Sequence, residues 1–176
     1  MSDKDKLKSD EMTEEELEGI AAAGTNYIHG TSQDDLLMGT AGNDRIYGGS
    51  GEDTIMGGDG NDTLDGGERD RANDVILGGG GNDLLCWGPS KDGSDFFDGG
   101  AGNDTLKLDL TGTGQATFQA ALESNYLTLS IEGDPDFTPS FDSQGHLVLP
   151  EGVTGTIIGP TGETMTFTNV EKISNI

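Results

Sequence analysis

A nine-residue unit with an aspartate at its sixth position repeats eight times between residues 30 and 107. The first four copies read GTSQDDLLM, GTAGNDRIY, GGSGEDTIM and GGDGNDTLD, starting at residue 30. Successive aspartates are 9, 9, 9, 12, 9, 12 and 9 residues apart, and an apolar residue follows each of them two positions later. These repeat aspartates are Asp35, Asp44, Asp53, Asp62, Asp74, Asp83, Asp95 and Asp104. A period this regular predicts a solenoid, in which each unit packs on its neighbours.

Each unit divides into a turn and a short strand. Its first six positions are rich in glycine, which adopts backbone angles that other residues avoid. Its last three positions carry the apolar residue, which the alternation of a strand places on the inner side. Two units complete one coil, so each loop lies on the loop two units away. The pattern predicts an all-β parallel roll over residues 24–109, with a thin apolar ladder inside.

The composition sets a condition on folding. The chain has 176 residues, with 33 Asp and Glu against nine Lys and Arg, and a formal net charge of −24. Leu, Ile, Val and Phe make up only about a fifth of it, so little apolar surface is available to offset chain entropy unless something neutralises the acid. The same charge repels nucleic acids and anionic membranes, and no apolar run has the length of a membrane span.

The unit matches the nonapeptide G-G-x-G-x-D-x-U-x, in which U is apolar. Residues 30–107 therefore resemble the RTX family of calcium-binding repeat proteins. The resemblance implies a β-roll in which loop positions 2, 4 and 6 face one Ca²⁺ ion and positions 1, 3 and 5 face the next. Main-chain carbonyls and carboxylates would supply the oxygen ligands that calcium prefers. Besides the eight repeat aspartates, the implied ligand residues are Gly42, Gly49, Gly51, Gly58, Gly60, Gly79, Gly81, Gly100, Gly102, Asn43, Asn61, Asn82 and Asn103.

The two 12-residue units carry their three extra residues in the turn, and both fall on the same edge of the coil. We call this edge the inserted edge; its aspartates are Asp35, Asp53, Asp74 and Asp95. The regular edge has only six-residue loops, with Asp44, Asp62, Asp83 and Asp104. One ion in each gap between neighbouring loops gives about three to six calcium ions. We expect the regular edge to bind them more strongly.

Residues 1–23 differ in character from the repeats. The stretch MTEEELEGIAAAG, which starts at Met12, resembles the double-glycine leader peptides that peptidase-containing ABC transporters remove. The chain has Ala22–Ala23 where such leaders usually have two glycines. The resemblance implies cleavage after Ala23 or after Gly24. The alternative is a disordered, solvated tail that contains a short helix.

Residues 110–176 lack the nonapeptide and are expected to cap the open end of the roll. Their pattern predicts short strands at 116–118, 126–131, 146–149, 154–158 and 164–167, with a hairpin turn at 159–163. The closing stretch, with its F-x-N-V-E-x-I ending, resembles the strand segment that often follows RTX repeats. RTX proteins commonly carry an uncleaved C-terminal signal for type I secretion, so the resemblance makes this region a possible signal.

The sequence offers no catalytic constellation. His29 and His146 lie far apart and outside any zinc motif, and Cys86 has no base beside it in the sequence to activate a thiol nucleophile. We therefore expect a protein that is not an enzyme. An exported enzyme with its active site in residues 110–176 is the less favoured reading.

The function that we expect is that of a secreted, extracellular calcium-binding protein. The resemblance implies export by a type I or peptidase-containing ABC transporter, followed by folding as the repeats bind Ca²⁺ outside the cell. The alternative is a non-catalytic β-roll binding module for a polysaccharide or a partner protein, on a cell surface or free, like those of secreted epimerases and proteases.

Overall fold

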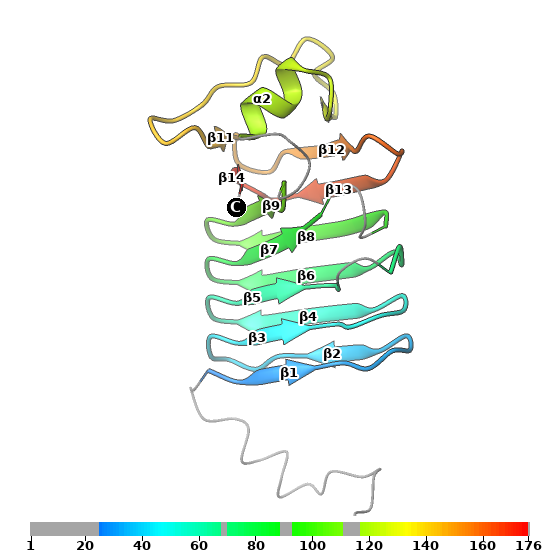
Figure 1. The fold of residues 1–176 in the computed structure, drawn as a ribbon. Helices are drawn as coiled ribbons and strands as arrows, with labels where there is room; N and C mark the ends of the chain where they lie inside the picture. Colours follow the sequence, from blue (N-terminus) through cyan, green and yellow to red (C-terminus); the bar gives the residue numbers. More distant parts are fainter. Residues whose placement is uncertain (1–24, 68–69, 89–92, 111–116, 176) are drawn as a thin grey trace, which may run out of the picture.

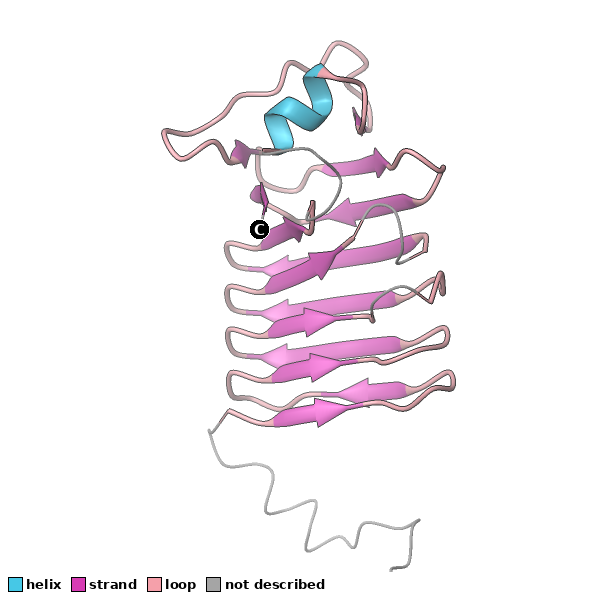
Figure 2. Ribbon diagram, in the orientation of Figure 1, coloured by secondary structure: helices cyan, strands magenta, loops and turns pink. Residues whose placement is uncertain are grey.

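A stack of coils, formed by two sheets that face each other, makes up most of the molecule (Figure 1). The computed structural model describes residues 25–67, 70–88, 93–110 and 117–175. Nearly every regular element is a strand (Figure 2). The predicted parallel β-roll is confirmed. The expected helix or leader in residues 1–23 lies outside the described residues.

The first sheet, sheet A, contains the strands of the even-numbered repeat units. Its order is β1-β3-β5-β7-β9-β14-β11. The strands span Tyr27–His29 (β1), Arg45–Tyr47 (β3), Thr63–Asp65 (β5), Leu84–Trp87 (β7), Thr105–Leu108 (β9), Lys172–Asn175 (β14) and Leu147–Val148 (β11). All its neighbours from β1 to β14 are parallel.

The second sheet, sheet B, contains the strands of the odd-numbered units and has the order β10-β12-β13-β8-β6-β4-β2. Its strands span Leu36–Met38 (β2), Thr54–Asp59 (β4), Val75–Gly80 (β6), Asp95–Ala101 (β8), Thr164–Thr168 (β13), Thr154–Ile158 (β12) and Thr128–Ile131 (β10). The pairing Thr54↔Val75 and Val75↔Phe96 keeps its register across both insertions. The extra residues therefore lie in the turns, as predicted.

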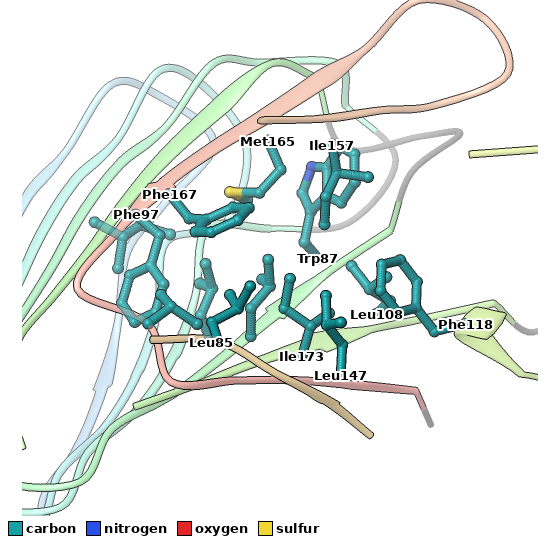
Figure 3. Packing of buried hydrophobic residues seen from close by; sticks show 14 of the residues in the cluster. Leu85, Trp87, Phe97, Leu108, Phe118, Leu147, Ile157, Met165, Phe167 and Ile173 are labelled. Carbon is teal, nitrogen blue, oxygen red and sulfur yellow. The ribbon is translucent and has the colours of Figure 1, made fainter. Parts of the chain in front are cut away.

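The core is the apolar ladder that the repeat predicts. The apolar residues at the eighth position are fully buried from the second unit onward, and Leu37 of the first unit is half-buried against them. The buried members are Ile46, Ile55, Leu64, Ile76, Leu85, Phe97 and Leu106. The cap continues this ladder, since Phe167 lies beside Phe97 (Figure 3). Ile173 likewise pairs with Leu106.

The outer face of sheet B is apolar near the start of the roll. Leu36, Met38 and Val75 are 65, 62 and 40 % exposed, and the half-buried Leu77 and Phe96 extend this face along β6 and β8. Threonines replace them on the outer positions of β12 and β13. Apart from Asp98, and Asp59 at the loop end of β4, the outward side chains of these strands are uncharged. We call this surface the sheet B face.

The cap contains the strands that the sequence predicts at 126–131, 146–149, 154–158 and 164–167, in the form of β10, β11, β12 and β13. β12 and β13 form the expected antiparallel hairpin, closed by a hydrogen bond from the Gly159 N–H to the Glu163 carbonyl. β13 then pairs in parallel with β8. The cap is thus joined to the roll by main-chain hydrogen bonds.

The expected strand at 116–118 is wrong. Of this stretch Ala116 lies outside the described residues, and Thr117 and Phe118 begin helix α2, Phe118–Glu123. The Thr117 side chain accepts a hydrogen bond from the Ala120 N–H, as a helix N-cap does. Phe118 and Ala121 are both buried, so tertiary packing of one helix face outweighs the local β preference. Among the described residues no helix has the length and hydropathy to span a membrane.

Candidate metal centre

The repeat aspartates form two ladders, one along each edge of the roll. In every step, the N–H of one aspartate donates to Oδ1 of the aspartate in the next coil. On the regular edge the N···O distances from Asp44 to Asp62, Asp62 to Asp83 and Asp83 to Asp104 are 2.7, 2.8 and 2.7 Å. On the inserted edge the steps from Asp35 to Asp53 to Asp74 to Asp95 measure 2.8, 2.9 and 2.8 Å. One carboxylate oxygen of each aspartate thus belongs to the fold.

The second carboxylate oxygen has no partner in four of these aspartates. Oδ2 of Asp53, Asp62, Asp83 and Asp104 is buried without a hydrogen bond, and these residues are only 1 to 2 % exposed. Burying an uncompensated carboxylate oxygen is costly, so such groups are normally hydrogen-bonded or bound to a metal. On the regular edge these oxygens recur in three successive coils, at Asp62, Asp83 and Asp104, and Asp53 adds one on the inserted edge.

The glycines bring main-chain oxygens close to these carboxylates. A methyl group on Gly57, at the first loop position, would lie 2.4 Å from Asp62 Oδ2 and 2.5 Å from the Gly78 carbonyl oxygen of the next coil. At the second position, Gly58 has φ +104° and a methyl group there would meet the Thr40 carbonyl oxygen at 2.1 Å. Only glycine fits such a close backbone approach. Each gap between loops is therefore lined by oxygen atoms.

Burial shifts the acidity of the ladder. It withholds solvation from the charged form, and with the neighbouring carboxylates it raises the pKa of Asp74 and of Asp83 to about 6. Burial likewise raises the pKa of Asp53, Asp62 and Asp104. A bound cation would compensate this accumulated negative charge.

The donor set suits a hard cation. The described residues contain no group of three or more His, Cys, Asp or Glu side chains placed to share one metal ion. The gaps at Asp53, Asp62, Asp83 and Asp104 offer instead an unpartnered carboxylate oxygen beside main-chain carbonyls, which are the oxygen ligands that Ca²⁺ takes in proteins. The residues present fit calcium.

The comparison with protein families agrees with this geometry. A family model of the RTX calcium-binding nonapeptide repeat matches four times, at residues 20–55, 38–68, 70–86 and 91–108. These residues form an RTX calcium-binding repeat domain. Searches among curated proteins and among solved structures give no significant match to the chain.

The asparagines of the RTX loops form a further ladder on the outside. Asn61 N–H donates to Asn43 Oδ1 at 2.8 Å, Asn82 N–H to Asn61 at 2.7 Å, and Asn103 N–H to Asn82 at 2.9 Å. All four asparagines are exposed. The side-chain oxygens of Asn43, Asn61 and Asn82 are thus engaged within the fold, which leaves the main-chain carbonyl as the oxygen with which these three would bind calcium.

The first two RTX loops differ from the others because threonine replaces the second glycine. Thr40 donates to Asp44 Oδ2 from its N–H at 2.6 Å and from its hydroxyl at 2.9 Å. Thr31 does the same for Asp35, at 2.6 and 2.8 Å. Although burial would raise it, hydrogen bonds from Thr40 and Asn26 lower the pKa of Asp44. In these two aspartates Oδ2 therefore already has partners, and Asn26 also donates to Oδ1 of Asp44.

Sequence reasoning missed a further repeat unit that precedes the eight. Strand β1 pairs in register with β3, with Ile28 beside Ile46, so the described residues 25–29 occupy the place of the end of a unit, with Asn26 in the aspartate position. Asn26 Nδ2 donates to Asp44 Oδ1 at 2.9 Å. The signal was present in the sequence, since Asn26 and Ile28 lie nine residues before Asp35 and Leu37.

The insertion adds a carboxylate to the inserted edge. Asp70 Oδ2 accepts a hydrogen bond from the Gly51 N–H at 3.0 Å. Its charge contributes to the raised pKa of both Asp53 and Asp74. On the regular edge the loops instead pair as continuous strands, with Gly58↔Gly79 and Gly79↔Gly100. The two edges therefore share the aspartate ladder and differ in the backbone around it.

Proposed function

We propose that this RTX protein leaves the cell without metal and folds when its repeats bind Ca²⁺ outside. The observation that supports this is the set of buried, unpartnered carboxylate oxygens at Asp53, Asp62, Asp83 and Asp104, the last three in successive coils of the regular edge. Without a cation these groups oppose the folded roll, and with calcium at about millimolar concentration their binding free energy becomes folding free energy. Within the repeats the aspartates and loop carbonyls hold about three to six ions, and the protein has no catalytic activity.

Calcium titration of the chelator-stripped chain tests the folding step. We expect far-ultraviolet circular dichroism to change from coil to β as calcium is added, and calorimetry to count three or more ions. Asp62→Asn removes a buried ladder carboxylate and should weaken binding at least tenfold. Asp136→Asn removes an exposed carboxylate in the cap, outside the RTX loops, and serves as the matched control. A stripped protein that is already folded and ignores calcium would overturn the proposal.

Export through an ABC-type exporter is the second part of the proposal. An unfolded acidic chain suits passage through a narrow channel, and the resemblance of residues 12–24 to a double-glycine leader supports a peptidase-containing transporter. Mass spectrometry of the protein recovered from the medium tests this route. Loss of residues 1–23 or 1–24 supports the leader, whereas an intact N-terminus on secreted protein supports type I export by a C-terminal signal. Retention in the cell would contradict both.

One observation favours the alternative, a binding module. The sheet B face is apolar and nearly uncharged, on a chain whose net charge is −24. A second copy of this chain is the partner that this face fits, because two such faces can meet without opposing carboxylates. Seven strands about 4.8 Å apart and about five residues long would bury about 1,000 Å² between two copies, which is the lower end of specific interfaces. A polysaccharide is less favoured, since Trp87, at the end of β7, is 1 % exposed and offers no stacking surface.

Sedimentation equilibrium in calcium tests this association. We expect a weak dimer at tens of micromolar protein, which Val75→Lys on the sheet B face abolishes. Val148→Lys is the matched control, because Val148 is a strand valine of similar exposure in the cap, 44 against 40 %. A wild-type protein that stays monomeric at every concentration would exclude the dimer, and glycan binding by that monomer would restore the polysaccharide reading.

A further inference from the structure

The cap ends the roll with a strand in the register of one more RTX unit on the regular edge. β14 pairs in parallel with β9, with Lys172 beside Thr105 and Ile173 beside Leu106. The residue before β14, Glu171, therefore lies beside Asp104, at the place where a further coil would have its repeat aspartate. The sequence around it, TNVEKI, contains no nonapeptide.

Glu171 makes the hydrogen bond that a repeat aspartate makes. Its Oε2 accepts the Asp104 N–H at 2.7 Å, as Asp104 Oδ1 accepts the Asp83 N–H at 2.7 Å. The main-chain hydrogen bonds also follow the pattern of the repeats, because the Lys172 N–H donates to the Asp104 carbonyl as the Thr105 N–H donates to the Asp83 carbonyl. The Glu171 N–H donates to the Asp104 carbonyl as well. The carboxylate ladder of the regular edge thus has one more member than the repeats encode.

Asn169 supplies the carbonyl oxygen of the missing loop. A methyl group on Gly99 would lie 2.0 Å from the Asn169 carbonyl oxygen and 2.6 Å from Asp104 Oδ2. In the first such gap of the regular edge, a methyl group on Gly39 would lie 2.0 Å from the Gly57 carbonyl and 2.8 Å from Asp44 Oδ2. Asn169 reaches this position with a left-handed backbone, φ +51°, and its side chain donates to Asp98 at 2.8 Å.

An unpartnered oxygen points to a ligand in this gap. Asp104 is 1 % exposed, and its Oδ2 has no hydrogen-bond partner. Burial and the nearby charge of Glu171 act together on this carboxylate. The gap therefore brings together an orphaned carboxylate oxygen, a main-chain carbonyl and a second carboxylate, all of them hard oxygen donors.

We propose that the loop at 99–104 and the turn at 169–171 form a terminal calcium site that the repeats do not encode. This inference rests on the proposed calcium binding of the RTX loops and adds one ion to those between repeats. The ion joins Asp104 of the roll to Glu171 and Asn169 of the cap, which lie 65 or more positions apart in the sequence. Calcium binding then fastens the cap to the roll.

Counting calcium on the full chain tests the terminal site. Glu171→Gln keeps an acceptor oxygen for the Asp104 N–H and removes the charge, so we expect calorimetry to count one ion fewer than in the wild type. Glu132→Gln, at an exposed glutamate elsewhere in the cap, is the control and should keep the wild-type count. If the wild type binds calcium and Glu171→Gln binds the same number with equal affinity, the terminal site is rejected while the repeat sites stand. A wild type that binds none would instead reject the proposed function.

A measurement on the wild type avoids any folding defect of the variant. A small fraction of Gd³⁺, added to the calcium-saturated protein, broadens the amide signals close to each ion site. We expect the amides of Val170 and Glu171 to broaden as strongly as those of the repeat loops. Sharp signals for these two amides beside broadened repeat signals would overturn the terminal site.

Discussion

At the scale of the residue, four of the repeat aspartates have two separate tasks. In Asp53, Asp62, Asp83 and Asp104, Oδ1 holds neighbouring coils together and Oδ2 is left for a cation. Asp62 shows the division plainly, because Oδ1 accepts the Asp44 N–H at 2.7 Å while Oδ2 is buried without a partner. The group that specifies the fold therefore also opposes it until charge is neutralised.

The pH dependence of the metal-free protein follows from these carboxylates. Folding raises the pKa of Asp74 and Asp83 from 3.8 to about 6. Their stabilising contribution is therefore full below about pH 4, where they are protonated in both states, and is lost as the pH rises through about 6. In chelator we expect the β signal in circular dichroism to be stronger at pH 4.5 than at pH 7.5, and calcium to restore it at pH 7.5. An equal signal at both pH values would contradict this.

Threonine at the second loop position should reduce the contribution of the neighbouring aspartate to calcium affinity. Because Thr40 already donates twice to Asp44 Oδ2, we expect Asp44→Asn to weaken the average calcium affinity less than Asp62→Asn does. We expect about a twofold loss against at least tenfold, measured by calorimetry on the two variants in parallel. Equal losses would mean that calcium displaces the threonine hydrogen bonds without cost.

At the scale of the element, the sequence predicted the strands of all eight nonapeptide units. The two-unit coil, the inward residues and the location of the insertions all follow from one period, and the register Ile55↔Ile76↔Phe97 bears this out. The candidate aspartates were found in the same way. Asn26 was missed because an amide stands in the aspartate position.

The cap was harder to predict, because its elements depend on contacts distant in sequence. β14 forms by pairing with β9, which is distant in sequence. The residue before it that accepts the Asp104 N–H is Glu171 and not an aspartate, so the local sequence pattern did not indicate this strand. Helix α2 has only six residues, too few for a helical period to stand out. Its position depends on burying Phe118, which packs edge-on against Phe141.

The two edges of the roll should differ in their calcium affinity. On the regular edge the loops pair as strands through Gly79, whereas the insertion before Asp74 interrupts that pairing and brings in Asp70. We expect Asp83→Asn to lower calcium affinity more than Asp74→Asn, because the regular loops hold their carbonyls in one repeated geometry. Calorimetry compares the two. A larger loss for Asp74→Asn would show that the Asp70 carboxylate makes the inserted edge the stronger one.

At the scale of the whole molecule, the repulsion between the carboxylates of the roll requires a bound ion, and screening by dissolved salt is not enough to offset it. Neighbouring coils lie about 4.8 Å apart, so adjacent ladder carboxylates are closer than the screening length of about 8 Å at physiological ionic strength. Diffuse counterions therefore screen only a small part of the repulsion between adjacent carboxylates. An ion held between the loops acts within that distance and also satisfies the orphaned oxygens.

The size of the chain in solution tests this distinction. For 176 residues the expected radius of gyration is about 44 Å unfolded and about 16 Å for a compact fold, and an elongated roll with a tail lies somewhat above the latter. In chelator we expect small-angle X-ray scattering to give a value near the unfolded one, and calcium at about a millimolar to reduce it by roughly half. Potassium chloride at the same ionic strength, or at tenfold higher, should cause only slight contraction. If the potassium salt compacts the chain as calcium does, general screening folds the roll and the gaps between its loops need no bound ion.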